Sequence, residues 1–132
     1  MEVKRLLMMA VAAGLLGCAT PSPEAQAPAL GEVVIQDFES REPTACTTAD
    51  VDLNEARVRQ FFARAQTIDY RTLTERHPIA PCALLGNVRV AGQWCDWTIR
   101  PGGVGSLRCG EHEQHYFCAG CADLYAPQAT AQ

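Results

Sequence analysis

The residues best suited to chemistry form a cluster near the C-terminus, in which cysteine and histidine recur every three residues. Its members are Cys109, His112, His115, Cys118 and Cys121. Two thiolates and two imidazoles are a ligand set that suits a tetrahedral zinc ion. If residues 114–118 form a β-strand, however, His115 and Cys118 point to opposite faces of it. The same cysteines would complete an even set of disulfides, so we expect disulfides here, with no metal and no other cofactor.

Cys118 and Cys121 also have the spacing of a thioredoxin-like redox pair. A redox site needs its first cysteine at the start of a helix within a βαβ unit, because the helix dipole lowers the thiol pKa. No such setting surrounds this pair, and the chain has no nucleophile elbow, phosphate loop or dinucleotide fingerprint. We therefore expect no enzymatic activity. A metal-binding or thiol-redox protein that uses the Cys109–Cys121 cluster stays an alternative.

Cysteine is unusually frequent for a chain of 132 residues, since seven are present. One of them, Cys18, belongs to an N-terminal signal described below. The other six are an even number, which in an oxidising compartment predicts three disulfides. A domain of under 100 residues has a marginal core, which disulfides can stabilise. The candidates are Cys46, Cys82, Cys95, Cys109, Cys118 and Cys121.

One clear helix is expected in the first half of the domain, over residues 53–66. Asp52 and Glu55 have the spacing of a capping box, with Asp52 as the N-cap residue. The apolar residues that follow recur at helical spacing, which predicts one buried face. They are Val58, Phe61, Phe62 and Ala65. A shorter helical turn is expected over residues 71–76.

The apolar period then changes from the helical repeat to two, which indicates β-strands. Turn signals divide the stretch from Cys82 to Cys118 into four strands, and the strongest of them is Pro101-Gly102-Gly103. Centring that turn places Cys95 opposite Cys109. The fold class expected is α+β, with one main helix packed on a four-stranded antiparallel meander and held by disulfides. Residues 32–38 are expected to add an edge strand.

The alternation within the strands predicts which side chains face solvent. Polar and aromatic side chains gather on that outward face, and a tryptophan flanked by arginines suits a protein–protein hot spot. The candidate binding residues are Arg89, Trp94, Arg100, Arg108 and His115. The alternative is that this face is only the solvated side of an amphipathic sheet.

The N-terminus has the composition of a secretory signal. Lys4 and Arg5 precede an uncharged apolar run to Gly17, which is shorter than the about 20 residues of a membrane-spanning helix. Residues 1–17 are therefore expected to be a signal peptide. Residues 18–30 are rich in proline and alanine, which predicts an extended tether. The domain is expected over residues 31–126, with a disordered tail over 127–132.

The sequence Leu15-Leu16-Gly17-Cys18 resembles the lipobox of bacterial lipoproteins. The resemblance implies that Cys18 carries a covalent diacylglycerol, that the signal is cut before it, and that its new amino group accepts a further acyl chain such as palmitate. In Gram-negative bacteria the next residue directs sorting, and Ala19 implies the outer membrane, with the domain on its periplasmic face. More than one acyl chain gives durable anchoring.

A second resemblance covers the domain from Phe61 to Tyr125. Pro81-Cys82, Gly92-Gln-Trp-Cys-Asp-Trp-Thr-Ile-Arg100, Gly102-Gly-Val-Gly105 and Cys118-x-x-Cys121 are similar to segments of small cysteine-rich lipoproteins of Proteobacteria. The resemblance supports a single fold and implies no activity.

Charge narrows the class of partner. The formal net charge is −4 and the pI is about 5.3, which argues against nucleic acid as a ligand. We therefore expect a non-enzymatic binding module for another envelope protein, for example an immunity protein or an inhibitor, held at the membrane by its lipid. A structural component of the envelope is the alternative.

Overall fold

The computed structural model describes residues 14, 17 and 28–127. The segment expected to be a signal peptide, apart from Gly14 and Gly17, therefore lies outside the described residues. So do Cys18, most of the expected tether, and the residues after Pro127. Within the described part no helix has the length and apolar character needed to cross a membrane.

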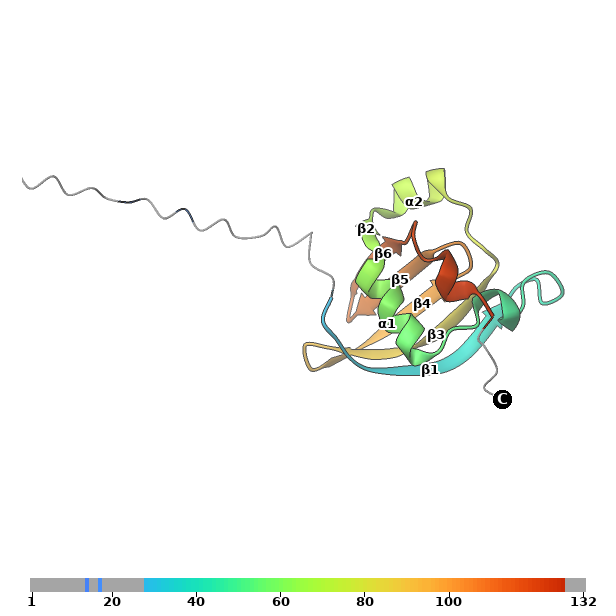
Figure 1. Ribbon diagram of the computed structural model, residues 1–132, viewed down its shortest axis with the longest axis horizontal. Helices are drawn as coiled ribbons and strands as arrows, with labels where there is room; N and C mark the ends of the chain where they lie inside the picture. The colour runs from blue at the N-terminus through green and yellow to red at the C-terminus, as the bar shows by residue number, and fades with distance from the viewer. Residues whose placement is uncertain (1–13, 15–16, 18–27, 128–132) are drawn as a thin grey trace, which may run out of the picture.

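The domain is built on one six-stranded antiparallel sheet, in the order β1-β3-β4-β5-β6-β2. Figure 1 shows the sheet curving behind helix α1, with β1 along one edge. The strands are β1 (Leu30–Ser40), β2 (Gln66–Ile68), β3 (Cys82–Val90), β4 (Gln93–Arg100), β5 (Val104–Cys109) and β6 (His112–Phe117). Four of these strands, β3 to β6, form the meander that the alternation predicts.

The expected fold class is nevertheless wrong. The structure is mostly β, with six strands and two short helices, α1 (Glu55–Arg64) and α2 (Tyr70–Arg76). The edge strand β1 is 11 residues long and pairs with β3 over most of its length. The other edge is β2, which is too short at 3 residues to show a period of two. Strand pairing with β6, a non-local contact, determines its conformation.

Helix α1 is shorter than expected and begins at a different cap. Its N-cap is Asn54 rather than Asp52, and the Asn54 side chain accepts a hydrogen bond of 2.9 Å from the Arg57 amide. The 3-10 turn η2 (Thr48–Val51) precedes it and buries Val51. The helix ends at Arg64 because Ala65 is extended and leads directly into β2. The shorter helix expected over residues 71–76 is confirmed as α2.

Helix α1 covers one face of the sheet, which we call the inner face. Val58, Phe61 and Phe62 are buried in one core cluster with Trp97, whose exposed fraction is 1%. Two glycines make room for these rings. A Cβ at Gly86 would overlap the Trp97 indole and the Val34 carbonyl, and one at Gly105 would lie 2.6 Å from the Phe61 ring. The close packing of these rings therefore requires glycine at positions 86 and 105, because any side chain there would overlap a ring.

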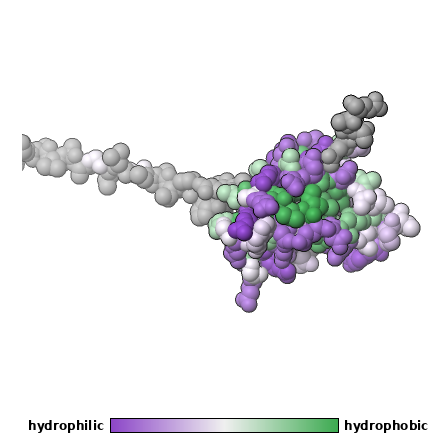
Figure 2. Space-filling view, turned by 90° about the horizontal axis from the view of Figure 1, so that it is seen from below, coloured by the Kyte–Doolittle hydropathy of each residue, from purple (hydrophilic) through white to green (hydrophobic). Residues whose placement is uncertain are grey.

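The last turn, η3 (Ala122–Tyr125), closes the core beside α1. The Arg57 guanidinium donates to the carbonyls of Leu124 and Ala126, at 2.8 and 2.5 Å. Arg64 forms an ion pair of 2.9 Å with Asp123, and the hydrogen bond from Arg64 lowers the pKa of that carboxyl. Figure 2 views the molecule from the side on which β1 lies in Figure 1 and shows apolar surface ringed by hydrophilic residues.

All six domain cysteines form disulfides, as their even number predicts. Cys95 and Cys109 lie opposite each other on β4 and β5, with Cα atoms 4.5 Å apart, so the expected cross-strand pair is confirmed. Cys118 pairs with Cys121, which closes the tight turn after β6. Cys46 pairs with Cys82, 36 residues along the chain, and ties the loop after β1 to the start of β3.

Candidate functional site

The outer face of the sheet, opposite α1, carries the side chains that the alternation of β4 sends outward. Trp94 is 44% exposed, whereas Trp97 on the opposite phase is 1% exposed. The five candidate binding residues all belong to this outer face, but the structure separates them into two groups. Arg89, Trp94 and Arg108 lie toward the β3–β4 hairpin. Arg100 and His115 line a cavity under α2.

The first group belongs to an ordered surface that we call the hairpin patch, which consists of Asn87, Arg89, Trp94, Asp96 and Arg108. Arg89 and Trp94 are paired across β3 and β4, and the Arg89 guanidinium lies 4.7 Å from the indole centroid. In the next row the Asp96 carboxylate accepts hydrogen bonds from Asn87, at 2.6 Å, and from Arg108, at 3.2 Å. These cross-strand contacts fix an exposed indole on a rigid sheet.

Arg100 has a different role from the one expected. Its guanidinium donates to the Ala80 carbonyl at 2.9 Å and to the Cys82 carbonyl at 3.4 Å, so it holds the segment before β3 against the sheet. Burial, and next to it the charge of Arg41, lowers the pKa of Arg100. Its own carbonyl accepts a hydrogen bond of 2.8 Å from the Tyr125 hydroxyl. Burial raises the pKa of that phenol above its ordinary range, which favours the donating form.

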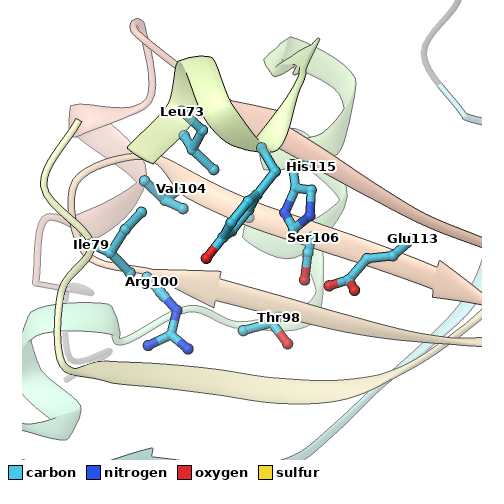
Figure 3. Close-up of a pocket in the computed structure, with 10 residues that line it drawn as sticks. Leu73, Ile79, Thr98, Arg100, Val104, Ser106, Glu113 and His115 are labelled. Atoms are coloured by element: carbon cyan, nitrogen blue, oxygen red, sulfur yellow. The ribbon is translucent and has the colours of Figure 1, made fainter. Parts of the chain in front are cut away.

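The cavity beside Arg100 has a volume of about 270 Å³, and we call it the α2 pocket (Figure 3). Helix α2 and the segment after it form one wall, and the outer faces of β4, β5 and β6 form the other. The lining residues are Tyr70, Leu73, Ile79, Thr98, Arg100, Val104, Gly105, Ser106, Glu113 and His115. Thr98, Ser106 and His115 form one row, because Ser106 is the register partner of both others.

Of this lining, only Arg100 and His115 are among the binding residues that the sequence predicts. Thr98 and Ser106 carried a usable signal, since they share the outward phase of their strands with those two residues. The sequence around Tyr70 contains no such signal, because no local pattern indicates on which face of the sheet a seven-residue helix packs. The structure seats its ring against His115, with centroids 5.0 Å apart. Leu73, 1% exposed, anchors the helix.

The pocket contains the residue types of a hydrolytic triad, namely Ser106, His115 and Glu113. Such a site needs the nucleophile hydrogen-bonded to the imidazole, and the imidazole oriented by a third group. Among residues 28–127 the structure gives no hydrogen bond between His115 and either Ser106 or Glu113. Ring contact with Tyr70 orients the imidazole instead. The arrangement therefore fits binding better than acyl transfer.

The cysteine–histidine cluster does not come together as a metal site. Cys109 is bonded to Cys95, and Cys118 to Cys121, which leaves His112 and His115 of the five residues. In the part of the chain that the structure describes, no three His, Cys, Asp or Glu side chains are placed to hold a metal ion. Cys118 and Cys121 are 5% and 0% exposed, so attacking thiols have little access to their bond.

The outer face thus carries, among other features, an exposed aromatic patch at the hairpin and a pocket under α2 with polar and apolar walls. Comparison of the chain with protein-family models, with curated proteins and with solved structures found no match.

Proposed function

We propose that this protein is a lipoprotein of the bacterial envelope, whose domain binds another envelope protein through the hairpin patch without catalysing a reaction. The observation that carries the proposal is the exposed Trp94, held by Arg89 and set beside the Asn87–Asp96–Arg108 row. Tryptophan and arginine are the residues most enriched among those that dominate binding energy at protein interfaces. A partner that covers the indole removes a large apolar surface from water.

The patch is already ordered before any partner binds. Contact with the Arg89 guanidinium limits the rotamers of the indole, and two hydrogen bonds fix the Asp96 carboxylate between strands. Binding then costs less conformational entropy than it would for free side chains. The patch has two arginines and one aspartate, so it is basic on an acidic chain. We therefore expect acidic side chains at the rim of the partner's surface.

The start of the first described strand and the hairpin patch are at the same end of the sheet. The first described strand begins at Leu30, whose register partner is Val90 beside the β3–β4 hairpin. A lipid on Cys18 would thus pull on the domain at the end that carries Trp94. The eleven residues from Ala19 to Ala29 span on the order of 35 Å when extended. The partner we propose therefore lies close to the membrane surface.

Replacing Cys18 with serine should release the protein from the membrane. The substitution removes the thiol that accepts the diacylglycerol, and a chain with a formal net charge of −4 has no overall electrostatic attraction to an anionic membrane. Fractionation of cells that express Cys18→Ser should recover the protein in the soluble periplasmic fraction. Ala19→Ser is the matched control and should stay in the membrane pellet. Continued pelleting of Cys18→Ser in a strain without the partner would contradict the anchor.

Photo-crosslinking in intact cells tests the binding function. A benzophenone amino acid is placed at position 94, in the hairpin patch, or at position 63. Ala63 is exposed on α1, on the other side of the sheet. We expect position 94 to give one discrete adduct with another envelope protein and position 63 to give none. Equal yields from the two positions, or no adduct from position 94, would count against the proposal.

A further inference from the structure

The α2 pocket brings together polar side chains that have no hydrogen-bond or ion-pair partner among the described residues. The side chains of Tyr70, Thr98, Ser106, Glu113 and His115 form no hydrogen bond or ion pair with any described residue. Glu113 is the register partner of Arg108, yet Arg108 bonds to Asp96 instead. These five side chains, from three strands and one helix, therefore line one cavity without a hydrogen bond or ion pair to any described residue.

The chemistry of these groups favours a ligand that both donates and accepts hydrogen bonds. Three of them are hydroxyls, from Tyr70, Thr98 and Ser106, and a hydroxyl can do both. The two charged side chains of the lining, Arg100 and Glu113, have opposite signs. Figure 3 shows them on either side of Thr98 and Ser106. Because the charges balance, and because Arg100 already bonds to two carbonyls, an ion of either sign is disfavoured.

The remaining wall is apolar and aromatic. Leu73, Ile79 and Val104 line the side beneath α2, and Ile79 is 37% exposed. Tyr70 is 63% exposed, and its ring contacts the His115 imidazole, with centroids 5.0 Å apart. A flat aromatic surface next to hydroxyls matches a ligand with one apolar side and one hydroxylated side. Sugar rings have this character, and the apolar wall suits a methyl group beside such a ring.

The pocket is also rigid and small. Asp69 caps α2 by accepting a hydrogen bond of 2.9 Å from the Thr72 amide. Arg100 and the Cys46–Cys82 disulfide hold the segment that leads into β3. Little ordering is then needed on binding. A volume of about 270 Å³ is just below that of sites for drug-sized ligands, and it accommodates one sugar ring.

We propose that the α2 pocket binds a small neutral saccharide that carries an N-acetyl group. The ring hydroxyls would bond to Thr98, Ser106 and Glu113, the ring would pack on Tyr70, and the acetyl methyl would lie against the exposed Ile79. The site is separate from the hairpin patch, and neither proposal depends on the other.

The test uses the full chain, labelled with nitrogen-15 and purified in a detergent without a sugar headgroup. N,N′-Diacetylchitobiose is titrated while amide chemical shifts are recorded. We expect saturable shifts at Ser106 and His115, with a dissociation constant on the order of 1 mM. Tri-alanine and inorganic phosphate should give no saturable shift. The proposal is overturned if the disaccharide does not shift these amides at about 20 mM, which is about 20-fold above the expected dissociation constant.

Variants locate the site. Tyr70→Ala removes an exposed ring, and Glu113→Gln removes a charge without changing shape, so neither should unfold the domain. Each should weaken binding of the disaccharide by about tenfold or more. Trp94→Ala removes the exposed ring of the hairpin patch and should leave the affinity for the disaccharide unchanged. Equal affinity in Tyr70→Ala and the parent would exclude this pocket as the site. Tighter binding of tri-alanine or phosphate than of the disaccharide would overturn the ligand class.

Discussion

Replacing Trp97 with alanine should lower the free energy of unfolding by about 3–5 kcal/mol, the usual cost of truncating a large buried aromatic side chain. The indole is 1% exposed and belongs to the same core cluster as Phe61 and Phe62. Its Nε1 donates a hydrogen bond of 3.0 Å to the Asn87 carbonyl, and the variant loses this bond. Because Gly86 faces it with no side chain, the neighbouring strand has nothing that can fill the cavity. Denaturant unfolding followed by circular dichroism measures the loss.

Trp94→Ala is the matched control, since it removes the same side chain three residues away on the opposite phase of β4. We expect its stability to change by no more than about 1 kcal/mol, mainly through loss of the contact with Arg89. If Trp94→Ala unfolds far more easily than Trp97→Ala, the faces of β4 are exchanged. The hairpin patch would then be core.

Removing the Cys46–Cys82 disulfide should have the second-largest effect. The bond joins residues 36 positions apart and closes the largest loop of the three, so it restricts the unfolded chain most. By the chain-entropy model, the double variant Cys46→Ala/Cys82→Ala should lose about 3–4 kcal/mol of stability. Both cysteines are buried, so part of the loss also comes from packing. Thermal unfolding under non-reducing conditions measures the change.

The double variant Cys118→Ala/Cys121→Ala separates these two causes. Its cysteines are equally buried, but the sequence separation is 3, so the entropy term is much smaller. We expect this variant to melt at a higher temperature than the Cys46/Cys82 variant. The reverse order would mean that local packing around the Cys118–Cys121 turn, rather than loop closure, dominates the contribution of the disulfides.

The features that could be predicted from the sequence are those with local causes. Strict alternation over Trp94–Arg100 sets the phase of β4, and the Pro101–Gly103 turn then sets its register against β5. Together they place Cys95 opposite Cys109, as the structure has them. The helical spacing of Val58, Phe61 and Phe62 predicts the buried side of α1 for the same reason. In each case short-range periodicity and the global fold agree.

The features that could not be predicted depend on non-local pairing. The segment Gln66–Ile68 becomes a strand only because β6 offers it a free edge. Asn54 replaces Asp52 as the cap because Val51 and Leu53 are buried and fix the chain entering α1. The added strands β1 and β2, together with the shorter α1, turn the expected four-stranded α+β fold into a six-stranded, mostly β one.

The α2 pocket could not be predicted from the sequence for a related reason. Helix α2 packs on the outer face of the sheet and forms one wall of a pocket that Ser106 and His115 also line, and the buried Leu73 holds the helix there. The outward phase of the strands was predictable, but not which part of that face remains exposed. As a result, residues expected to form one surface, such as Trp94 and His115, belong to two.

The most direct test of the proposed binding function is the affinity of the full chain for the envelope protein that crosslinks at position 94. Trp94→Ala should weaken this affinity by at least about 2 kcal/mol, or about 30-fold. Tyr70→Ala, which removes the other exposed ring of the outer face, should leave it unchanged. Isothermal titration calorimetry on the parent and both variants gives the comparison. Unchanged affinity in Trp94→Ala, or an equal loss in Tyr70→Ala, would contradict the hairpin patch as the docking surface.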